Sequence, residues 1–179
     1  AQATEPYWSG PKEKVDQFRI VGNDASLPWG RPELVVEVGY RSFGVESNLR
    51  SHAEYRYSSP RFGGEQRHDL MVVPAITLAV QPSVSIIPVA AGDWWLQVGV
   101  TNNGKEPVSG QLTLRVPAGW RKEPAVHDLS FEREEETLVK TFRLFPAEDL
   151  SAGGFQIEAV VNLDGRSYGS GYQVIDYDH

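Results

Sequence analysis

Four histidines are the residues of this 179-residue sequence best suited to acid–base chemistry or metal binding. They are His52, His68, His127 and His179, and none has a second histidine within five residues, so the helical two-histidine zinc motif is absent. His52 and His68 fall on neighbouring predicted strands and could face each other, with Asp69 beside them. We favour an ordinary surface pair there, and we predict no catalytic residue, no metal and no cofactor.

Several other catalytic and binding chemistries are excluded by composition and motif. The sequence has no cysteine, which removes disulfides, thiolate zinc sites and cysteine nucleophiles. It contains neither a glycine-rich phosphate loop nor a nucleophile elbow of the Gly-x-Ser-x-Gly type. The acidic run Glu132–Glu136 lacks the glycine around which a calcium loop turns, so we predict a solvated turn between two strands.

The charge balance argues against nucleic acid as a partner. Lys and Arg number 17 against 24 Asp and Glu, a formal net charge of −7, whereas nucleic-acid binding needs a basic surface. The longest nearly apolar run, Met71–Val80, has ten residues and includes a proline. A spanning helix needs about 20 apolar residues. We therefore predict no membrane span.

The aromatic residues offer a second kind of chemistry, because an exposed ring can stack on the face of a sugar. Trp94 and Trp95 open a predicted strand, so one ring should point inward and the other outward. Tyr7 and Trp8 lie in an irregular lead-in. These four residues are the candidate contacts for a glycan or a partner. The alternative, which we favour, is that Trp95 and Trp8 cover the junction between the two halves of the chain or pack on another domain. Trp120 is predicted to cap the open end of the second half.

Alternating apolar residues predict strands throughout the second half. Leu96, Val98 and Val100 alternate with polar or small residues, the period-two pattern of a sheet with one buried face. Turn residues such as Asp164–Gly165 separate the runs. Seven runs are found, at 85–90, 94–101, 109–116, 123–131, 136–145, 154–163 and 166–176. This many short strands predicts an immunoglobulin-like β-sandwich over residues 82–179.

Two stretches of the second half have alternative interpretations. Residues 132–142 can be drawn as an amphipathic helix, but the threonine and valine content around them favours a strand. Gly169–Gly171 has a serine between two glycines. Because no strand-to-helix switch follows it, we interpret this segment as a close-packed part of the final strand.

The first half is less regular but is also predicted to be β. After an irregular lead-in over residues 1–14, four strands are predicted at 15–21, 33–41, 46–57 and 65–80. Four strands make a small or incomplete sandwich, which we expect to pack against a neighbouring domain. Pro74 and Pro82 bracket the predicted hinge. The fold prediction is therefore all-β, with two small immunoglobulin-like antiparallel β-sandwich domains in tandem, 15–81 and 82–179, the first of them small or incomplete.

Short motifs of the second half follow one another in a recognisable order. They are Val98–Gly104 (VGVTNNG), Val108–Gly110 (VSG), Leu114–Trp120 (LRVPAGW), Phe142–Pro146 (FRLFP) and Gly153–Phe155 (GGF). Together they resemble a bacterial accessory module, the alpha-galactosidase-associated (NPCBM-associated) domain. Its pattern is V-x-V-T-N-x-G, then V-x-G, then L-x-V-P-x-G-W. The resemblance implies a β-sandwich attached to a larger protein.

A second set of motifs extends over essentially the whole chain. These are Pro6–Trp8 (PYW), Glu54–Tyr57 (EYRY), Gly64–Arg67 (GEQR), Val72–Ala75 (VVPA) and Tyr172–His179 (YQVIDYDH). They resemble the C-terminal extension of large exported bacterial members of the PIG-L (LmbE-like) deacetylase family. The sequence departs from that pattern at Ala75 and Asp178, where proline is usual.

The PIG-L resemblance implies a role without catalysis. Family members deacetylate N-acetylglucosamine-type amides with zinc, held by a Pro-His-Pro-Asp-Asp-like motif and a later His-x-x-His, and neither motif is present here. The expected partner is then the catalytic domain of the same protein, in cis, with a glycan as a second candidate ligand. The family's usual export implies a periplasmic or secreted location. The first six residues lack the basic and apolar regions of a signal peptide.

Overall fold

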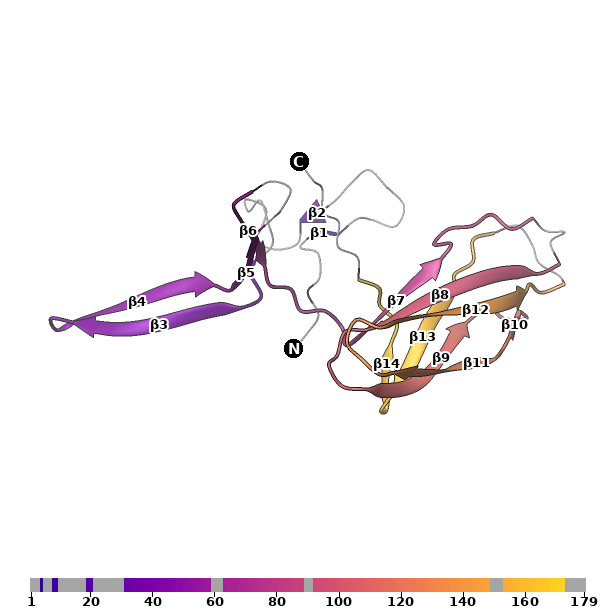
Figure 1. Ribbon diagram of the computed structural model, residues 1–179. Helices are drawn as coiled ribbons and strands as arrows, with labels where there is room; N and C mark the ends of the chain where they lie inside the picture. The colour runs from indigo at the N-terminus through magenta and orange to yellow at the C-terminus, as the bar shows by residue number, and fades with distance from the viewer. Residues whose placement is uncertain are drawn as a thin grey trace. The chain divides into compact units, whose positions relative to one another are not determined.

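The computed structural model describes Thr4 and residues 8–9, 19–20, 31–58, 63–88, 92–148 and 153–172 (Figure 1). Over these residues the chain is all-β, as predicted, and its strands form several small antiparallel sheets. No helix in this described part is long and apolar enough to cross a membrane. The chain divides into two compact units, residues 1–72 and 73–179.

The second unit consists of two four-stranded sheets (Figure 1). Neighbours in the first sheet are β10 (Arg121–Glu123), β12 (Thr137–Phe145), β8 (Trp94–Asn102) and β7 (Ile76–Gln81). Neighbours in the second sheet are β11 (Val126–Phe131), β9 (Val108–Arg115), β13 (Glu158–Leu163) and β14 (Arg166–Tyr168). Every pair of neighbouring strands is antiparallel.

One hydrophobic core joins these two sheets. Leu96, Val98 and Val100 of β8 are buried in it, as their alternation predicted, together with Phe142 of β12 and Phe131 of β11. Trp120 is buried in the same core. Because the inward positions of one sheet bury apolar area against those of the other, the outward positions are left free for polar or functional side chains.

The acidic run of residues 132–136 is a turn, as predicted. The Glu136 carboxylate accepts hydrogen bonds from the backbone N–H groups of Glu132 (2.7 Å) and Arg133 (3.4 Å). Asn102 is buried beside this turn. Its side-chain amide donates to the Arg133 carbonyl (3.1 Å), and its side-chain oxygen accepts from the Gly104 N–H (3.0 Å). The asparagine therefore ties the acidic turn to the end of β8.

Close packing at Gly169–Gly171 agrees with the sequence interpretation. A Cβ atom on Gly171 would lie 2.6 Å from the carbonyl oxygen of Leu78 in β7. The adjacent Ser170 carbonyl accepts a hydrogen bond from the Leu78 N–H (3.1 Å). No side chain fits between the two backbones at Gly171, even though β14 itself ends at Tyr168.

The described part of the first unit contains three two-stranded antiparallel sheets and no larger one (Figure 1). They pair β1 (Trp8–Ser9) with β2 (Arg19–Ile20), β3 (Val35–Ser42) with β4 (Val45–His52), and β5 (Glu54–Ser58) with β6 (Glu65–Asp69). All sixteen residues of β3 and β4 are exposed. A lone hairpin of this kind is marginally stable in water.

Several predicted boundaries in the first half differ from the structure. The predicted strand 46–57 is broken at Ala53, whose N–H bonds to the carbonyl of Leu34 (2.9 Å). The predicted strand 65–80 is split, and its second part, β7, pairs with β8 in the second unit. The units divide between residues 72 and 73, whereas the first domain was predicted to end at residue 81, with the hinge between Pro74 and Pro82. Pro82 ends β7 without marking a change of unit.

The remaining differences concern strand length. β1 lies inside the predicted irregular lead-in 1–14. No strand is present over residues 85–88, the described part of the run 85–90. The run 123–131 is interrupted after Glu123, since the next residue is proline and cannot donate to the ladder. Within the described residues the last two strands are shorter than predicted, at 158–163 and 166–168, and residues 173–176 of the predicted run 166–176 lie outside what the structure describes.

Candidate functional site

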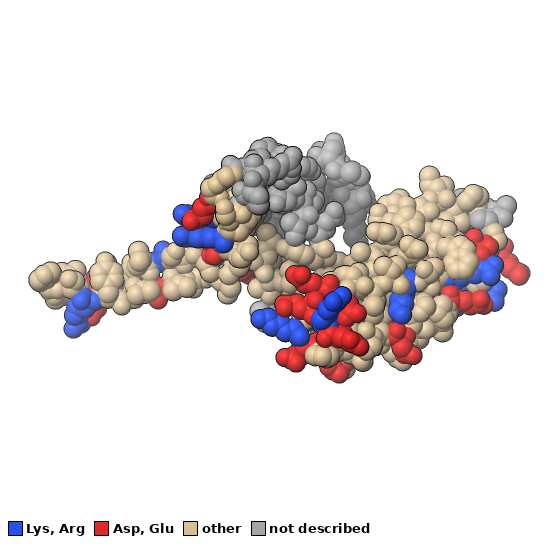
Figure 2. Space-filling model, viewed as in Figure 1, with Lys and Arg blue, Asp and Glu red and all other residues tan. Residues whose placement is uncertain are grey.

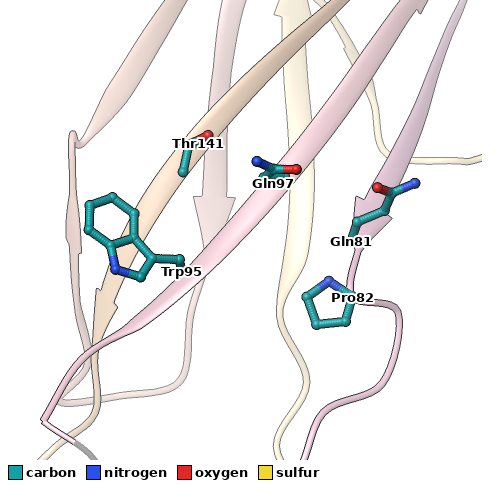
Figure 3. Close-up of a pocket in the computed structure, with 5 residues that line it drawn as sticks. All are labelled: Gln81, Pro82, Trp95, Gln97 and Thr141. Atoms are coloured by element: carbon teal, nitrogen blue, oxygen red, sulfur yellow. The ribbon is translucent and has the colours of Figure 1, made fainter.

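The candidate site is a shallow hollow on the outer face of the sheet β10-β12-β8-β7 (Figure 3). We call it the Trp95 shelf, and five residues line it: Gln81, Pro82, Trp95, Gln97 and Thr141. Its volume is about 720 Å³.

The strand register sets the positions of the side chains that line the shelf. Trp95 and Gln97 alternate with Leu96 and Val98, which are buried, so the first two side chains point outward. Gln97 is paired with Thr141 of β12 on one side and with Gln81 of β7 on the other. Figure 3 shows this row of polar side chains beside the indole. Three hydrogen-bonding side chains, one from each of three neighbouring strands, thus lie in a row beside the aromatic ring.

Arg143 borders the indole of Trp95. The two residues are paired across β8 and β12, and the guanidinium carbon lies 5.6 Å from the centre of the ring. Arg143 also makes an ion pair with Asp93. Trp95 nevertheless keeps 58% of its surface exposed. An open aromatic surface with amide and hydroxyl groups beside it can stack on an apolar ligand face and hydrogen-bond its polar edge.

The four candidate residues chosen from sequence have different places in the structure. Trp94 is half-buried and packs against the core, whereas Trp95 points outward, so the predicted inward–outward pair is confirmed. Trp8 belongs to β1, and its side chain lies outside what is described. Tyr7 is outside the described residues. The structure therefore places one of the four, Trp95, in the shelf.

Sequence reasoning missed the polar partners of Trp95. Gln97 could have been found, because it lies two residues along the same strand and so shares the outward face with Trp95. Gln81 and Thr141 could not, since they come from strands whose pairing partners and register are not written in the sequence.

A second surface of interest is one face of the β3–β4 hairpin in the first unit. Cross-strand pairing places two sets of residues on opposite faces. We call one set the hairpin's apolar face; its large side chains are Val36, Val38, Tyr40, Val45 and Leu49. The opposite face carries the pair Glu37–Arg50 and the ion pair Arg41–Glu46. Figure 2 shows the exposed hairpin, largely covered by uncharged side chains with a few charged ones near its tip.

The histidines proposed as a facing pair have separate partners. His68 lies against Tyr57, with Nε2 3.0 Å from the hydroxyl and the rings 5.4 Å apart. His52 lies beside Glu54 (Nε2 to Oε1, 2.8 Å) and Asp69 (Nε2 to Oδ1, 3.6 Å). The break at Ala53 redirects the chain between β4 and β5, so His52 meets carboxylates of the next hairpin.

Comparisons with protein-family models and with curated proteins found no match for this sequence.

Proposed function

We propose that this chain is a non-catalytic accessory module of a larger exported bacterial protein of the PIG-L deacetylase family. In this proposal residues 73–179 form an immunoglobulin-like β-sandwich resembling the NPCBM-associated domain. The first unit is an incomplete β domain that docks on the catalytic domain of the same protein, in the periplasm or outside the cell.

The observation that carries the proposal is the hairpin's apolar face. Five large apolar side chains on one side of β3–β4 are exposed, with nothing in the described part of the chain covering them. Fully burying a side chain of this size contributes about 1.5–3 kcal/mol. A domain that covered this face would therefore supply stability that a lone hairpin lacks, and tethering in one polypeptide would raise the effective concentration of the two surfaces.

The first experiment is to determine the mass and domain content of the protein as its source makes it. We expect a mass well above that of these 179 residues, with a zinc-motif domain upstream. Amide hydrogen exchange would then compare β3–β4 in the long protein and in this chain alone. Slower exchange only in the long protein supports docking. The proposal would be contradicted if the source organism makes a protein of only these 179 residues, or if amide exchange in β3–β4 is equal in the two forms.

A second candidate function, carbohydrate binding, is favoured by the Trp95 shelf. Its exposed indole and its row of amide and hydroxyl side chains suit a sugar, which has an apolar ring face and a polar edge. Polymers of N-acetylglucosamine are the first ligands to test, because the resembled family acts on such amides.

Binding of the intact chain to insoluble polysaccharide should be lost in Trp95→Ala. Val139→Ala is the matched control. Like Trp95, Val139 is an exposed apolar side chain of this sheet, but it belongs to β12 and does not line the shelf. Equal binding by wild type and Trp95→Ala, or equal loss in both variants, would exclude the shelf as the sugar site.

A further inference from the structure

His52, Glu54 and Asp69 bring three metal-ligating groups together where the β3–β4 and β5–β6 hairpins join. One ligand atom from each residue lies within 4.8 Å of the other two. We propose that His52 Nε2, Glu54 Oε1 and Asp69 Oδ1 bind a divalent metal ion, with Zn²⁺ the best fit, and that the ion fastens the base of the β3–β4 hairpin. This inference is independent of the docking and sugar-binding proposals.

The distances suit a small tetrahedral ion. Zn²⁺ binds histidine nitrogen and carboxylate oxygen at about 2.0–2.2 Å, which places neighbouring tetrahedral ligand atoms roughly 3.4 Å apart. His52 Nε2 is 2.8 Å from Glu54 Oε1 and 3.6 Å from Asp69 Oδ1, so the two distances lie on either side of that spacing. The third distance, between the two carboxylate oxygens, is no more than 4.8 Å, so side-chain rotation of about 1 Å at Asp69 or Glu54 would complete the first coordination shell.

Backbone pairing holds the ligands in place. Glu54 and Asp69 are direct cross-strand partners at the open end of the β5–β6 hairpin, so their side chains lie on the same face. His52 ends β4. Between them Ala53 accepts a hydrogen bond from the Leu70 N–H (3.5 Å) and donates one to the Leu34 carbonyl (2.9 Å). The ligand positions are therefore set by main-chain bonds, and an ion would join residues of both hairpins.

His52 Nε2 and Glu54 Oε1 are hydrogen-bonded to each other at 2.8 Å, and a bound ion would replace that hydrogen bond. Arg56 and Arg67 approach the other Glu54 oxygen, Oε2, at 3.6 and 3.7 Å. Such partners orient a ligating carboxylate while lowering the site's attraction for a cation, so moderate affinity is expected. The His52 and Asp69 side chains are 45% and 40% exposed, which leaves room for water as a fourth ligand.

The test uses the intact 179-residue chain without an affinity tag and zinc chloride as the only added metal. Equilibrium dialysis followed by elemental analysis should find one zinc per chain. His52→Gln and Asp69→Asn, which keep similar shapes, should each weaken binding at least about tenfold, since even outer-shell partners of a metal cost 10–100-fold. The control is His68→Gln. His68 precedes Asp69 in β6, but its ring hydrogen-bonds to the Tyr57 hydroxyl and is not one of the proposed ligands.

Circular dichroism would verify that each variant is folded. Zinc should also raise the melting temperature of the wild type more than that of His52→Gln, because an ion that binds the folded state stabilises it. The proposal is overturned if the wild type retains no zinc, if both ligand variants retain as much as the wild type, or if His68→Gln weakens binding as much as they do.

Discussion

The apolar face of the β3–β4 hairpin gives the sharpest test of the docking proposal. Val38 and Leu49 are cross-strand partners at its centre, and they are 50% and 62% exposed in this chain. Because complete burial of such a side chain contributes about 1.5–3 kcal/mol, covering the exposed part of both would contribute roughly 2–3 kcal/mol. The double variant Val38→Ser, Leu49→Ser should lose that amount wherever a second domain covers the face.

Comparing the double variant in this chain alone and in the longer protein distinguishes the effect of docking from that of cross-strand contact within the hairpin. In this chain alone, the cross-strand contact contributes only about 0.2–1 kcal/mol, so the double variant should change hairpin opening little. In the longer protein, a loss of roughly 2–3 kcal/mol corresponds to amide exchange in β3 and β4 that is about 30- to 150-fold faster. Hydrogen exchange with mass spectrometry measures both effects on the same peptides.

The matched control is on the opposite face of the same strand. Glu37→Ser removes a side chain that pairs with Arg50 and does not belong to the apolar face. It should leave exchange in the longer protein within a fewfold of the wild type, since a substitution at an exposed position on the polar face usually changes stability by no more than about 0.5 kcal/mol. Equal acceleration by the control and the double variant, or equal acceleration in both protein forms, would refute the docking argument.

Three further predictions concern the second unit. Gly110→Ala should destabilise it by about 1–3 kcal/mol in urea unfolding, because the new Cβ would lie 2.6 Å from the Asn162 carbonyl oxygen; Gly99→Ala, whose nearest atom would be 3.8 Å away, should change stability by less than about 0.5 kcal/mol. Asn102→Ala should cost about 1–3 kcal/mol, since it removes the buried side chain whose hydrogen bonds hold the Arg133 carbonyl and the Gly104 N–H; an unchanged urea midpoint would contradict this. Burial lowers the pKa of Lys122 below 10.5, so the unfolded state binds more protons between the lowered pKa and 10.5, and stability should rise with pH across that window. Urea titrations at several alkaline pH values should show a smaller rise for Lys122→Met, and equal slopes would contradict the assignment.

The sequence predicted the second unit well because one physical signal decided it. Leu96, Val98 and Val100 alternate with outward residues, and burying one face of a strand requires that period. The same signal predicted that one of the two rings of Trp94 and Trp95 points inward and the other outward. What it could not predict was the neighbour of each strand, since pairing depends on register between distant segments. The shelf residues Gln81 and Thr141 were missed for that reason.

The first unit shows the limit of the alternation signal. Val36, Val38 and Tyr40 alternate in the same way as the core strands, yet all three are exposed. Alternation identifies a face that needs covering but does not say whether the cover belongs to the same unit. Residues 76–81 were assigned to the first half, but as β7 they pair with β8 of the second unit. Pro82 indicates where this strand ends but does not indicate which strand it pairs with.

The histidine cluster shows why the proposed metal site could not be predicted from spacing. His52 and Glu54 are two residues apart, which on a continuous strand would put them on one face of one hairpin. The structure ends β4 at His52 and begins β5 at Glu54, so the two residues pair with Val35 and Asp69, on different strands. Because the strand is broken at Ala53, the His52 side chain at the end of β4 contacts Glu54 and Asp69 of the β5–β6 hairpin. If zinc binds there, its effect should extend to the β3–β4 hairpin, and zinc should slow amide exchange near Val35 and His52 in the wild type but not in Asp69→Asn.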